Sequence, residues 1–279
     1  MLKKGLLFML ITVLCAGMVM AYAPAKSNSY KDKPMTVEKL IGPDTELPAP
    51  DGLGPGSYAP LNTDDPIGDV FQFGTSWYDI QHNGTCGRQL HVDSDGYVHM
   101  VWMNGLITGA SLRHIYYQLM DPLDQLIFTE PSLGIQVDQS PRAGYTVMEV
   151  YSDNRAMPCF HQGNTINVNY HTALAFDYFP RVGAFQAQEL PWVYEGADDL
   201  EVIWPRMDMD IDGKFHIIST ENPASGVAGD PQRIYYSRVA FDPTTYTMTN
   251  ETPQQVVMDT VMVIASDIAA SPVSNRVVA

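Results

Sequence analysis

A short turn signature recurs four times along this chain at intervals of about 60 residues. Its copies are Asp95-Gly96, Asn154-Arg155, Asp212-Gly213 and Asn275-Arg276, so the turn centres at 95, 154, 212 and 275 lie 59, 58 and 63 residues apart. The first and third copies align without a gap, with "VDSDGYVHMVW" over "MDIDGKFHIIS". Self-similarity at a fixed period indicates a repeat architecture in which each copy is one small supersecondary unit.

Each copy lies among short runs that are rich in β-branched and aromatic residues. Gly, Pro, Asp and Asn separate these runs, and none of them keeps a helical period for three turns. Runs such as "YVHMVWM" are apolar almost throughout, which is typical of strands in sheets that are buried on both faces. The sequence therefore predicts an all-β fold over residues 67–279. We expect a β-propeller built from ~60-residue repeats, with about four blades present and the last one incomplete.

The N-terminus has the pattern of an export signal. Two lysines precede an unbroken apolar run that ends in the small residues Ala21, Ala23 and Ala25. This order predicts a signal peptide over residues 1–25 and a secreted, periplasmic or cell-surface protein, with an uncleaved anchor as the alternative. Residues 26–66 hold seven prolines and four glycines and predict an extended leader or linker. No other segment is apolar enough to span a membrane.

The charge balance excludes several classes of partner. The sequence carries 16 basic and 32 acidic side chains, a net charge of −16, and loss of the signal peptide would remove two of the lysines. Nucleic acid and anionic lipid surfaces both require basic patches, so neither is expected as a partner. The sequence also lacks the phosphate-binding loops of nucleotide enzymes and the G-x-S-x-G motif of serine hydrolases. No cofactor is predicted apart from a possible calcium ion.

Two cysteines, Cys86 and Cys159, follow the predicted signal peptide. In an oxidising compartment they either form a disulfide or remain as two isolated buried thiols. Their spacing matches no zinc-binding pattern, and the sequence leaves both alternatives open.

Alternating acids mark the third copy of the turn. Asp208, Asp210 and Asp212 precede Gly213, an order that opens a calcium loop and is equally suited to a tight hairpin turn with positive φ. An EF-type loop would need Glu where this sequence has Ser219. Because Asn-Arg replaces Asp-Gly in two of the copies, we expect a two-residue hairpin turn. The three aspartates then form, at most, a weak calcium site.

Two histidines and several acids are further candidates. His99 and His216 occupy equivalent places in two repeats, which favours a shared structural role as buried imidazoles bonded to a neighbouring strand. A glycosidase needs two carboxyl groups about 5–10 Å apart. The segment "YEGADDLEVIW" (194–204) sets four acids among aromatic residues, which suits a carbohydrate site or an ordinary acidic loop. The other acids considered are Glu130, Glu149, Asp153 and Glu189.

The strand motif formed by Asp95, Gly96, His99 and Trp102 resembles blades of secreted bacterial β-propellers of the sialidase-like repeat superfamily. The resemblance covers residues 67–279 and implies an exported propeller. It does not extend to sialidase chemistry, because the Ser-x-Asp-x-Gly-x-Thr-Trp spacing is absent and no local motif groups three of the arginines. We therefore expect a non-catalytic variant, and no catalytic residue is predicted.

The function expected from these features is that of an exported binding module. Its loops on one face would recognise a glycan or an extracellular protein. A glycoside hydrolase of sialidase-like fold is the alternative. Because the last repeat stops in the middle of a strand, we also expect this chain to be the front part of a longer protein.

Overall fold

The computed structural model describes residues 71–78, 81, 86–109, 111–166, 169–222, 231–261 and 264–279. The chain divides into two compact units, Met1–Asp69 and Val70–Ala279, and every described residue belongs to the second. The predicted signal peptide and leader lie outside the described residues. Within the described part of the chain, no helix is long and apolar enough to cross a membrane.

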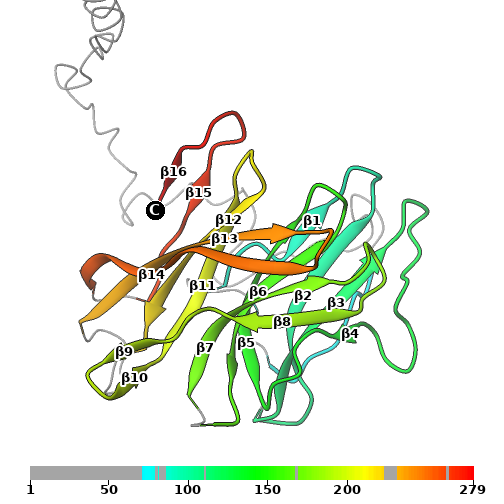
Figure 1. Ribbon diagram of the computed structural model, residues 1–279. Helices are drawn as coiled ribbons and strands as arrows, with labels where there is room; N and C mark the ends of the chain where they lie inside the picture. The colour runs from blue at the N-terminus through cyan, green and yellow to red at the C-terminus, as the bar shows by residue number, and fades with distance from the viewer. Residues whose placement is uncertain are drawn as a thin grey trace, which may run out of the picture. The chain divides into compact units, whose positions relative to one another are not determined.

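Three four-stranded antiparallel sheets make up most of the described chain (Figure 1). In each sheet the strands follow one another in sequence order. The first sheet contains β1 (Leu90–Val92), β2 (Val98–Gly105), β3 (Arg113–Met120) and β4 (Ile135–Gln136). The second contains β5 (Ala143–Val150), β6 (Ala156–Gly163), β7 (Tyr170–Asp177) and β8 (Phe185–Glu189). The third contains β11 (Val202–Met209), β12 (Lys214–Glu221), β13 (Gln232–Asp242) and β14 (Thr247–Val261).

Two short hairpins complete the described strands. β9 (Val193–Glu195) pairs with β10 (Asp198–Leu200) between the second and third sheets, and β15 (Ala269–Ala270) pairs with β16 (Val277–Val278) after the third. The described strands are all antiparallel to their neighbours and form no closed sheet. The all-β prediction is therefore confirmed. A count of about four blades is not confirmed, since three complete four-stranded sheets and one terminal hairpin are present.

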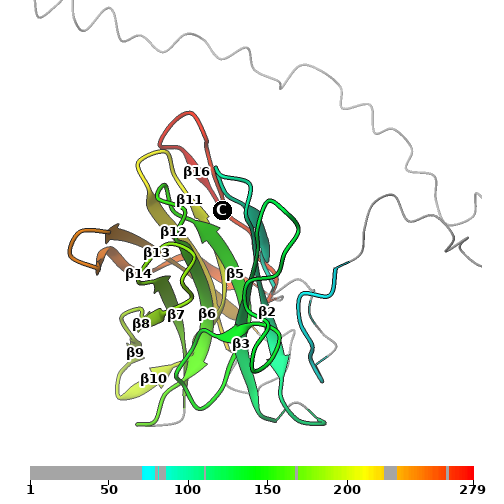
Figure 2. The ribbon, with the colours of Figure 1, turned by 90° about the vertical axis from the view of Figure 1, so that its right-hand side faces the viewer.

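The second sheet is buried on both faces, as Figure 2 shows from the side. Along β5 and β6, Met148 and Phe160 pack in the core shared with the first sheet, while their neighbours Val147 and Cys159 pack in the core shared with the third. Successive side chains of a strand point to opposite faces, so an uninterrupted apolar run fills both cores at once. This packing explains why the strand sequences show so little polar alternation.

The turn that the sequence repeats has the same hydrogen bonding in each of the three sheets. Gly96, Asn154 and Gly213 have φ of 85°, 68° and 74°, and their amides donate to Asp93 O, Tyr151 O and Asp210 O at 3.1, 2.8 and 3.0 Å. The loop between the closing residues has three residues rather than the predicted two, for example residues 94–96 between Asp93 and Tyr97. A type I turn followed by a left-handed residue has this form.

The second copy of the turn was aligned one residue out of register in the sequence analysis. Asn154 corresponds to Gly96 and Gly213, not to Asp95, because Asn is the residue besides Gly that best tolerates the left-handed region. Correcting this register by one residue changes which residues of the first strands are equivalent.

The two cysteines are both buried, and no disulfide joins them in the structure. Burial raises the pKa of the Cys159 thiol well above its usual value. Of the two alternatives that the sequence left open, the structure shows the pair of isolated thiols.

Candidate functional site

Three titratable residues occupy one equivalent position in the first strands of the three sheets. His91 on β1, Glu149 on β5 and Asp208 on β11 each lie five residues before the left-handed turn residue of their own sheet. In the structure these positions come together, because the first strands of successive sheets lie side by side. The repeat itself thus brings an imidazole and two carboxyl groups into one place.

Arg88 connects the two carboxyl groups. Its Nη2 donates to Glu149 Oε1 and lies 3.5 Å from Asp208 Oδ1. Both oxygens lie within 3.5 Å of that nitrogen, so they are at most about 7 Å apart, and the two carboxyl groups are neighbours. His91 Nδ1 lies 3.8 Å from the other oxygen of Glu149. These four side chains are called the Arg88 cluster below.

Two members of the Arg88 cluster, Arg88 and Asp208, line a cavity of about 440 Å³. The cavity is lined by the segment before β1, by β5 and β11, and by the segment before β15, including Gly87, Val147, Arg206, Asp208 and Asp267. A side chain at Gly87 would place its Cβ 2.5 Å from Val147 Cβ, so only glycine permits this close approach of the two segments. The lining is largely polar and carries charges of both signs.

Burial raises the pKa of Glu149 to about 7, although the positive charge of Arg88 acts in the opposite direction. Near neutral pH this carboxyl group is therefore present in both its protonated and its ionised form. Burial and the nearby Arg88 also lower the pKa of His91, so this imidazole stays neutral at a lower pH than is usual for histidine. A carboxyl group with a pKa near the working pH is able to donate a proton to a bound molecule.

Two aromatic residues in strained conformations lie further along the same strands. Tyr145 and Trp204 each stand four residues before the acid of their strand, and both have φ of 54°. Each lies at an irregularity in the pairing with the second strand, a β-bulge that redirects the side chain. Their rings meet edge to face with centroids 6.4 Å apart. Non-glycine residues with positive φ cost free energy and cluster at functional sites.

Tyr145 is itself held by polar contacts. Its hydroxyl lies 2.9 Å from that of Tyr78, and burial together with this contact raises the pKa of Tyr145 to about 12. The Arg113 guanidinium lies over both rings, 4.6 Å from the centroid of Tyr78 and 5.2 Å from that of Tyr145. The first strands of the second and third sheets thus carry an aromatic residue near one end and a carboxyl group near the other.

The structure separates the three aspartates that the sequence grouped as a calcium site. Asp208 accepts a hydrogen bond from Ala270 N at 2.7 Å and faces Arg88. Asp210 accepts from Asp212 N and Lys214 N, both at 2.9 Å. Asp212 accepts from the side-chain amide of Asn275 at 2.7 Å. Among the residues that the structure describes, no group of three or more His, Cys, Asp or Glu side chains is arranged to hold a metal ion. The calcium site stays a prediction, and its test is given below.

The two equivalent histidines have the structural role that the sequence predicted. His99 lies between Asp93 Oδ2 at 3.0 Å and Tyr117 OH at 2.8 Å, and it is fully buried. His216 repeats the arrangement with Asp210 Oδ2 at 2.9 Å and Tyr236 OH at 2.7 Å. In each case the tyrosine belongs to the neighbouring third strand, so the imidazole ties the turn to two strands. The second sheet has Tyr151, Met157 and Leu174 at these places instead.

The acids of the segment 194–204 are engaged in local contacts. Glu195 pairs with Arg233 at 2.8 Å, and Arg233 also pairs with Glu221 at 2.7 Å. Glu201 accepts from Tyr170 N at 2.8 Å, and Asp199 lies 3.2 Å from the buried His171. The segment therefore acts as a connection held by ion pairs, which agrees with the acidic-loop interpretation.

Comparison with known proteins gives weak similarities only. Neither a protein-family model nor a curated protein matches the chain. Similar solved structures include a thermostable family-43 glycoside hydrolase, with 13% identity, a TM-score of 0.39, and coverage of 60% of this chain and 57% of that one. An endo-1,4-β-xylanase from Bacteroides thetaiotaomicron has 14% identity and a TM-score of 0.38, with 62% and 59% covered.

A GH32 β-fructofuranosidase from Bombyx mori has 12% identity and a TM-score of 0.38, with 60% of this chain and 36% of that chain covered. The chain thus spans less than two thirds of each of these proteins. TM-scores below 0.5 establish neither a blade number nor an activity. The resemblance to sialidase-like propellers stays a prediction.

Proposed function

We propose that residues 67–279 form part of an exported β-propeller whose sheets are its blades, and that the cavity at the Arg88 cluster binds carbohydrate. The observation that carries this proposal is that Arg88 and Asp208 line one cavity, while Arg88 also holds Glu149, which lies beside His91. In a propeller the first strands surround the central channel, which is where loops and strands of all blades can contribute to one site.

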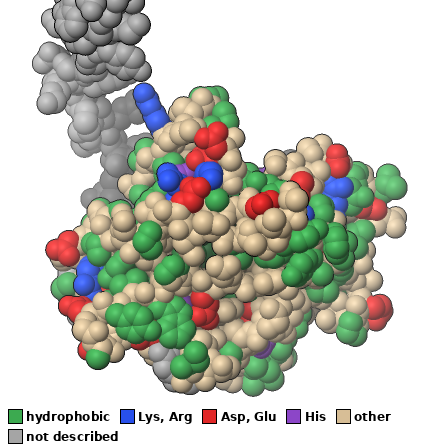
Figure 3. Space-filling view, in the orientation of Figure 1, with side chains coloured by type: hydrophobic (Ala, Val, Ile, Leu, Met, Phe, Trp, Pro, Cys, Tyr) green, Lys and Arg blue, Asp and Glu red, His purple; other side chains and the backbone are tan. Residues whose placement is uncertain are grey.

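The chemistry of the cavity suits the hydroxyl groups of a sugar. Carboxylates accept two hydrogen bonds from neighbouring hydroxyls, and the guanidinium of Arg88 donates several. Val147, Met207 and Ile268 supply the apolar part of the lining, against which the C–H face of a sugar ring can pack. On the face shown in Figure 3, basic side chains lie beside acidic ones rather than in a broad basic area, which agrees with a partner that is not nucleic acid.

Glycoside hydrolysis is the second candidate, and one observation favours it. Glu149 has a pKa of about 7, and the carboxyl group of Asp208 lies within about 7 Å of it. A protonated acid beside a second carboxylate is the pair that glycosidases use, one to protonate the leaving oxygen and the other to stabilise or attack the anomeric carbon. A protein partner, which the sequence also allowed, has no comparable observation in its favour.

The experiment that tests the proposal has two arms, both with the full chain. A glycan array detects binding, and a panel of chromogenic glycosides detects hydrolysis. We expect array binding that is weakened in Arg88→Ala. Hydrolysis that is abolished in Glu149→Gln while the fold is retained would favour the enzyme. Absence of binding to any glycan, together with absence of turnover, would contradict a carbohydrate function.

A further inference from the structure

A second cavity lies beside the first sheet, away from the Arg88 cluster, and it has an exposed tryptophan at its edge. Its volume is about 500 Å³, and its lining includes Trp77, Tyr116, Asn104, Leu106 and Ser132. Trp77 is 66% exposed, by far the most exposed of the four tryptophans. A tryptophan that stands at the edge of a cavity is placed to contact a molecule bound there.

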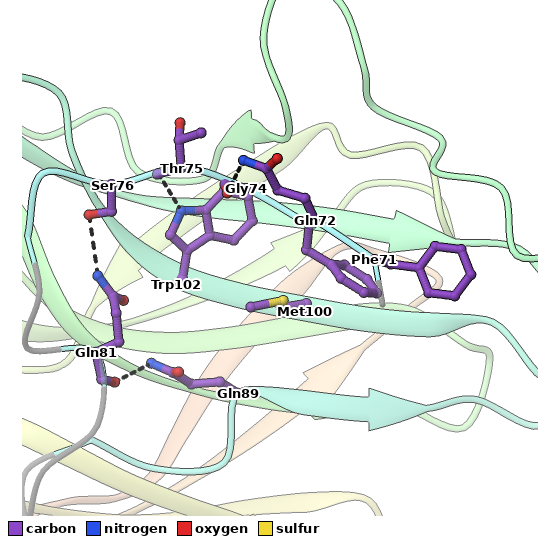
Figure 4. Close-up of a pocket in the computed structure, with 10 residues that line it drawn as sticks. Phe71, Gln72, Gly74, Thr75, Ser76, Gln81, Gln89, Met100 and Trp102 are labelled. Atoms are coloured by element: carbon purple, nitrogen blue, oxygen red, sulfur yellow. Dashed lines mark hydrogen bonds between the residues drawn. The ribbon is translucent and has the colours of Figure 1, made fainter. Parts of the chain in front are cut away.

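The backbone that carries Trp77 is held firmly against β2. Trp77 N donates to Gly105 O at 2.9 Å, Ser76 Oγ donates to Met103 O at 2.8 Å, and Trp102 Nε1 donates to Thr75 O at 3.1 Å. Figure 4 shows this segment lying over the Trp102 indole, with Gly74 against its six-membered ring. The exposed indole therefore stands on a fixed backbone rather than on a loose end.

The opposite wall of the cavity is also aromatic and also supported. Tyr116 on β3 contacts Trp102, with ring centroids 5.8 Å apart. Trp102 thus supports both aromatic residues, since its Nε1 donates a hydrogen bond to the segment that carries Trp77 and its ring packs on Tyr116. Two braced aromatic residues at the edge of one cavity form a preorganised recognition surface.

The polar groups of this cavity are uncharged, and several of them are available. None of its lining residues is Asp, Glu, Lys, Arg or His. No hydrogen bond among the described residues engages the side chains of Asn104, Tyr116 or Ser132. Asn104 is only 7% exposed, but its amide atoms are not among the buried unpartnered ones, so they reach the space of the cavity and are available to a bound molecule.

We propose that this cavity is a second saccharide site that takes a neutral sugar unit. Aromatic walls pack against the C–H faces of a pyranose or furanose ring, and the amide and hydroxyl groups bond its hydroxyls. A charged sugar would find no counter-charge in the lining, and a purely apolar partner would leave the Asn104 amide unsatisfied. The site shares no lining residue with the cavity at the Arg88 cluster, so the proposal stands independently of the function assigned there.

The test uses the full chain and three uncharged probes: cellohexaose, xylohexaose and mannohexaose. Tryptophan fluorescence with acrylamide quenching reports on Trp77, and calorimetry gives the affinity. We expect at least one probe to bind and to protect tryptophan from quenching. Trp77→Ala should weaken binding at least tenfold and Asn104→Ala by a comparable factor. Trp77→Phe, which keeps an aromatic wall, should retain most of the affinity.

The matched control is Leu123→Ala, which removes another exposed apolar side chain outside both cavities, and we expect it to leave probe binding unchanged. Asp208→Asn, which changes the other cavity, is measured beside it. Since Trp77 is exposed, its replacement should not disturb folding, and the melting temperature checks this. If no probe binds, or if binding is unchanged in both Trp77→Ala and Asn104→Ala, the inference is wrong. Binding that is lost in Asp208→Asn but kept in Trp77→Ala would assign the sugar to the Arg88 cluster and overturn the second site.

Discussion

The side-chain amide of Asn154 donates its Nδ2 to Asp95 Oδ2 at 3.0 Å and so joins the turn of the second sheet to the turn of the first. The same contact recurs between the fourth and third turns, where Asn275 Nδ2 donates to Asp212 Oδ2 at 2.7 Å. The alternation of Asp and Asn along the repeats is thus a pattern of contacts between successive turns. In Asn154 the amide also fits the left-handed backbone of the turn.

These two roles of Asn154 can be separated by substitution. Asn154→Gly keeps the backbone at its φ of 68° but loses the contacts with Asp95 and Ser94, so we expect a loss of about 1 kcal/mol in the free energy of unfolding. Asn154→Ala loses the same contacts and also forces an L-residue into the left-handed region, which costs roughly 1–2 kcal/mol more. Urea unfolding measures both values. An alanine variant more stable than the glycine variant would contradict this assignment.

The buried Asp93–His99–Tyr117 arrangement should contribute strongly to stability. His99→Met introduces the residue type that the second sheet carries at this place, and it removes the partner of Tyr117 OH and one partner of Asp93. Each buried polar group left unsatisfied costs about 1–3 kcal/mol. We expect calorimetry to show a large fall in melting temperature for His99→Met. The double variant His99→Met with Tyr117→Phe should lose less stability than the two single variants do when their losses are added. A loss in the double variant equal to that sum would argue against the contact between His99 and Tyr117.

The pKa of Glu149 predicts a specific dependence of stability on pH. Its folded value of about 7 lies above the ordinary value of 4.5, so between these pH values the folded chain holds a proton that the unfolded chain has released. The contribution of Glu149 to the free energy of unfolding is fully present below pH 4.5 and is lost as the pH rises through 7. Glu149→Gln cannot titrate, so the melting temperature of the parent relative to this variant should fall across that window.

The control for this titration is Glu130→Gln, which removes the same charge from an exposed position. Its melting temperature relative to the parent should show no comparable trend. A difference between the parent and Glu149→Gln that stays constant from pH 4.5 to pH 8 would show that Glu149 does not carry the raised pKa.

Calcium should have little effect on the fold. The carboxylates of Asp208 and Asp212 already accept hydrogen bonds from the C-terminal hairpin, and that of Asp210 accepts from Lys214 N beside its own turn. We expect melting temperatures in calcium and in chelator to differ by no more than a few degrees. Asp210→Asn should be destabilised equally in both, because it loses the charge beside His216. A calcium-dependent rise of many degrees that disappears in Asp210→Asn would establish the metal site.

More of the fold than of the candidate site could be predicted from the sequence. The turn signature and the uninterrupted apolar runs predicted an all-β fold of repeated units with both faces buried, because these features depend only on local backbone geometry and strand period. The roles of His99 and His216 followed from their equivalent places. The length of the turn, three residues rather than two, could not be predicted, because Asp-Gly suits both a two-residue turn and a three-residue turn that ends in a left-handed glycine.

Asn154, which stands where the first and third sheets have glycine, concealed the Arg88 cluster. Aligning Asn154 with Asp95 placed Glu149 opposite Leu90, whereas aligning it with Gly96 places Glu149 opposite His91 and Asp208. The correct register was the one signal in the sequence that could have grouped the three residues. The left-handed conformations of Tyr145 and Trp204 could not be found in this way, because β-bulges leave no reliable mark in a single sequence.

The most direct test of the central claim compares two aspartates of the third sheet, one on β11 and one in the turn that follows it. Asp208→Asn and Asp212→Asn remove the same charge, but Asp208 lines the cavity at the Arg88 cluster and Asp212 bonds to Asn275 on the next turn. The measurement is binding of the full chain to a glycan array, with melting temperatures as a check on folding. The account predicts that binding of at least one glycan is lost in Asp208→Asn, while binding at the separate Trp77 cavity persists, and that Asp212→Asn retains all binding of the parent. Equal binding by the parent and both variants would show that this cavity is not the carbohydrate site.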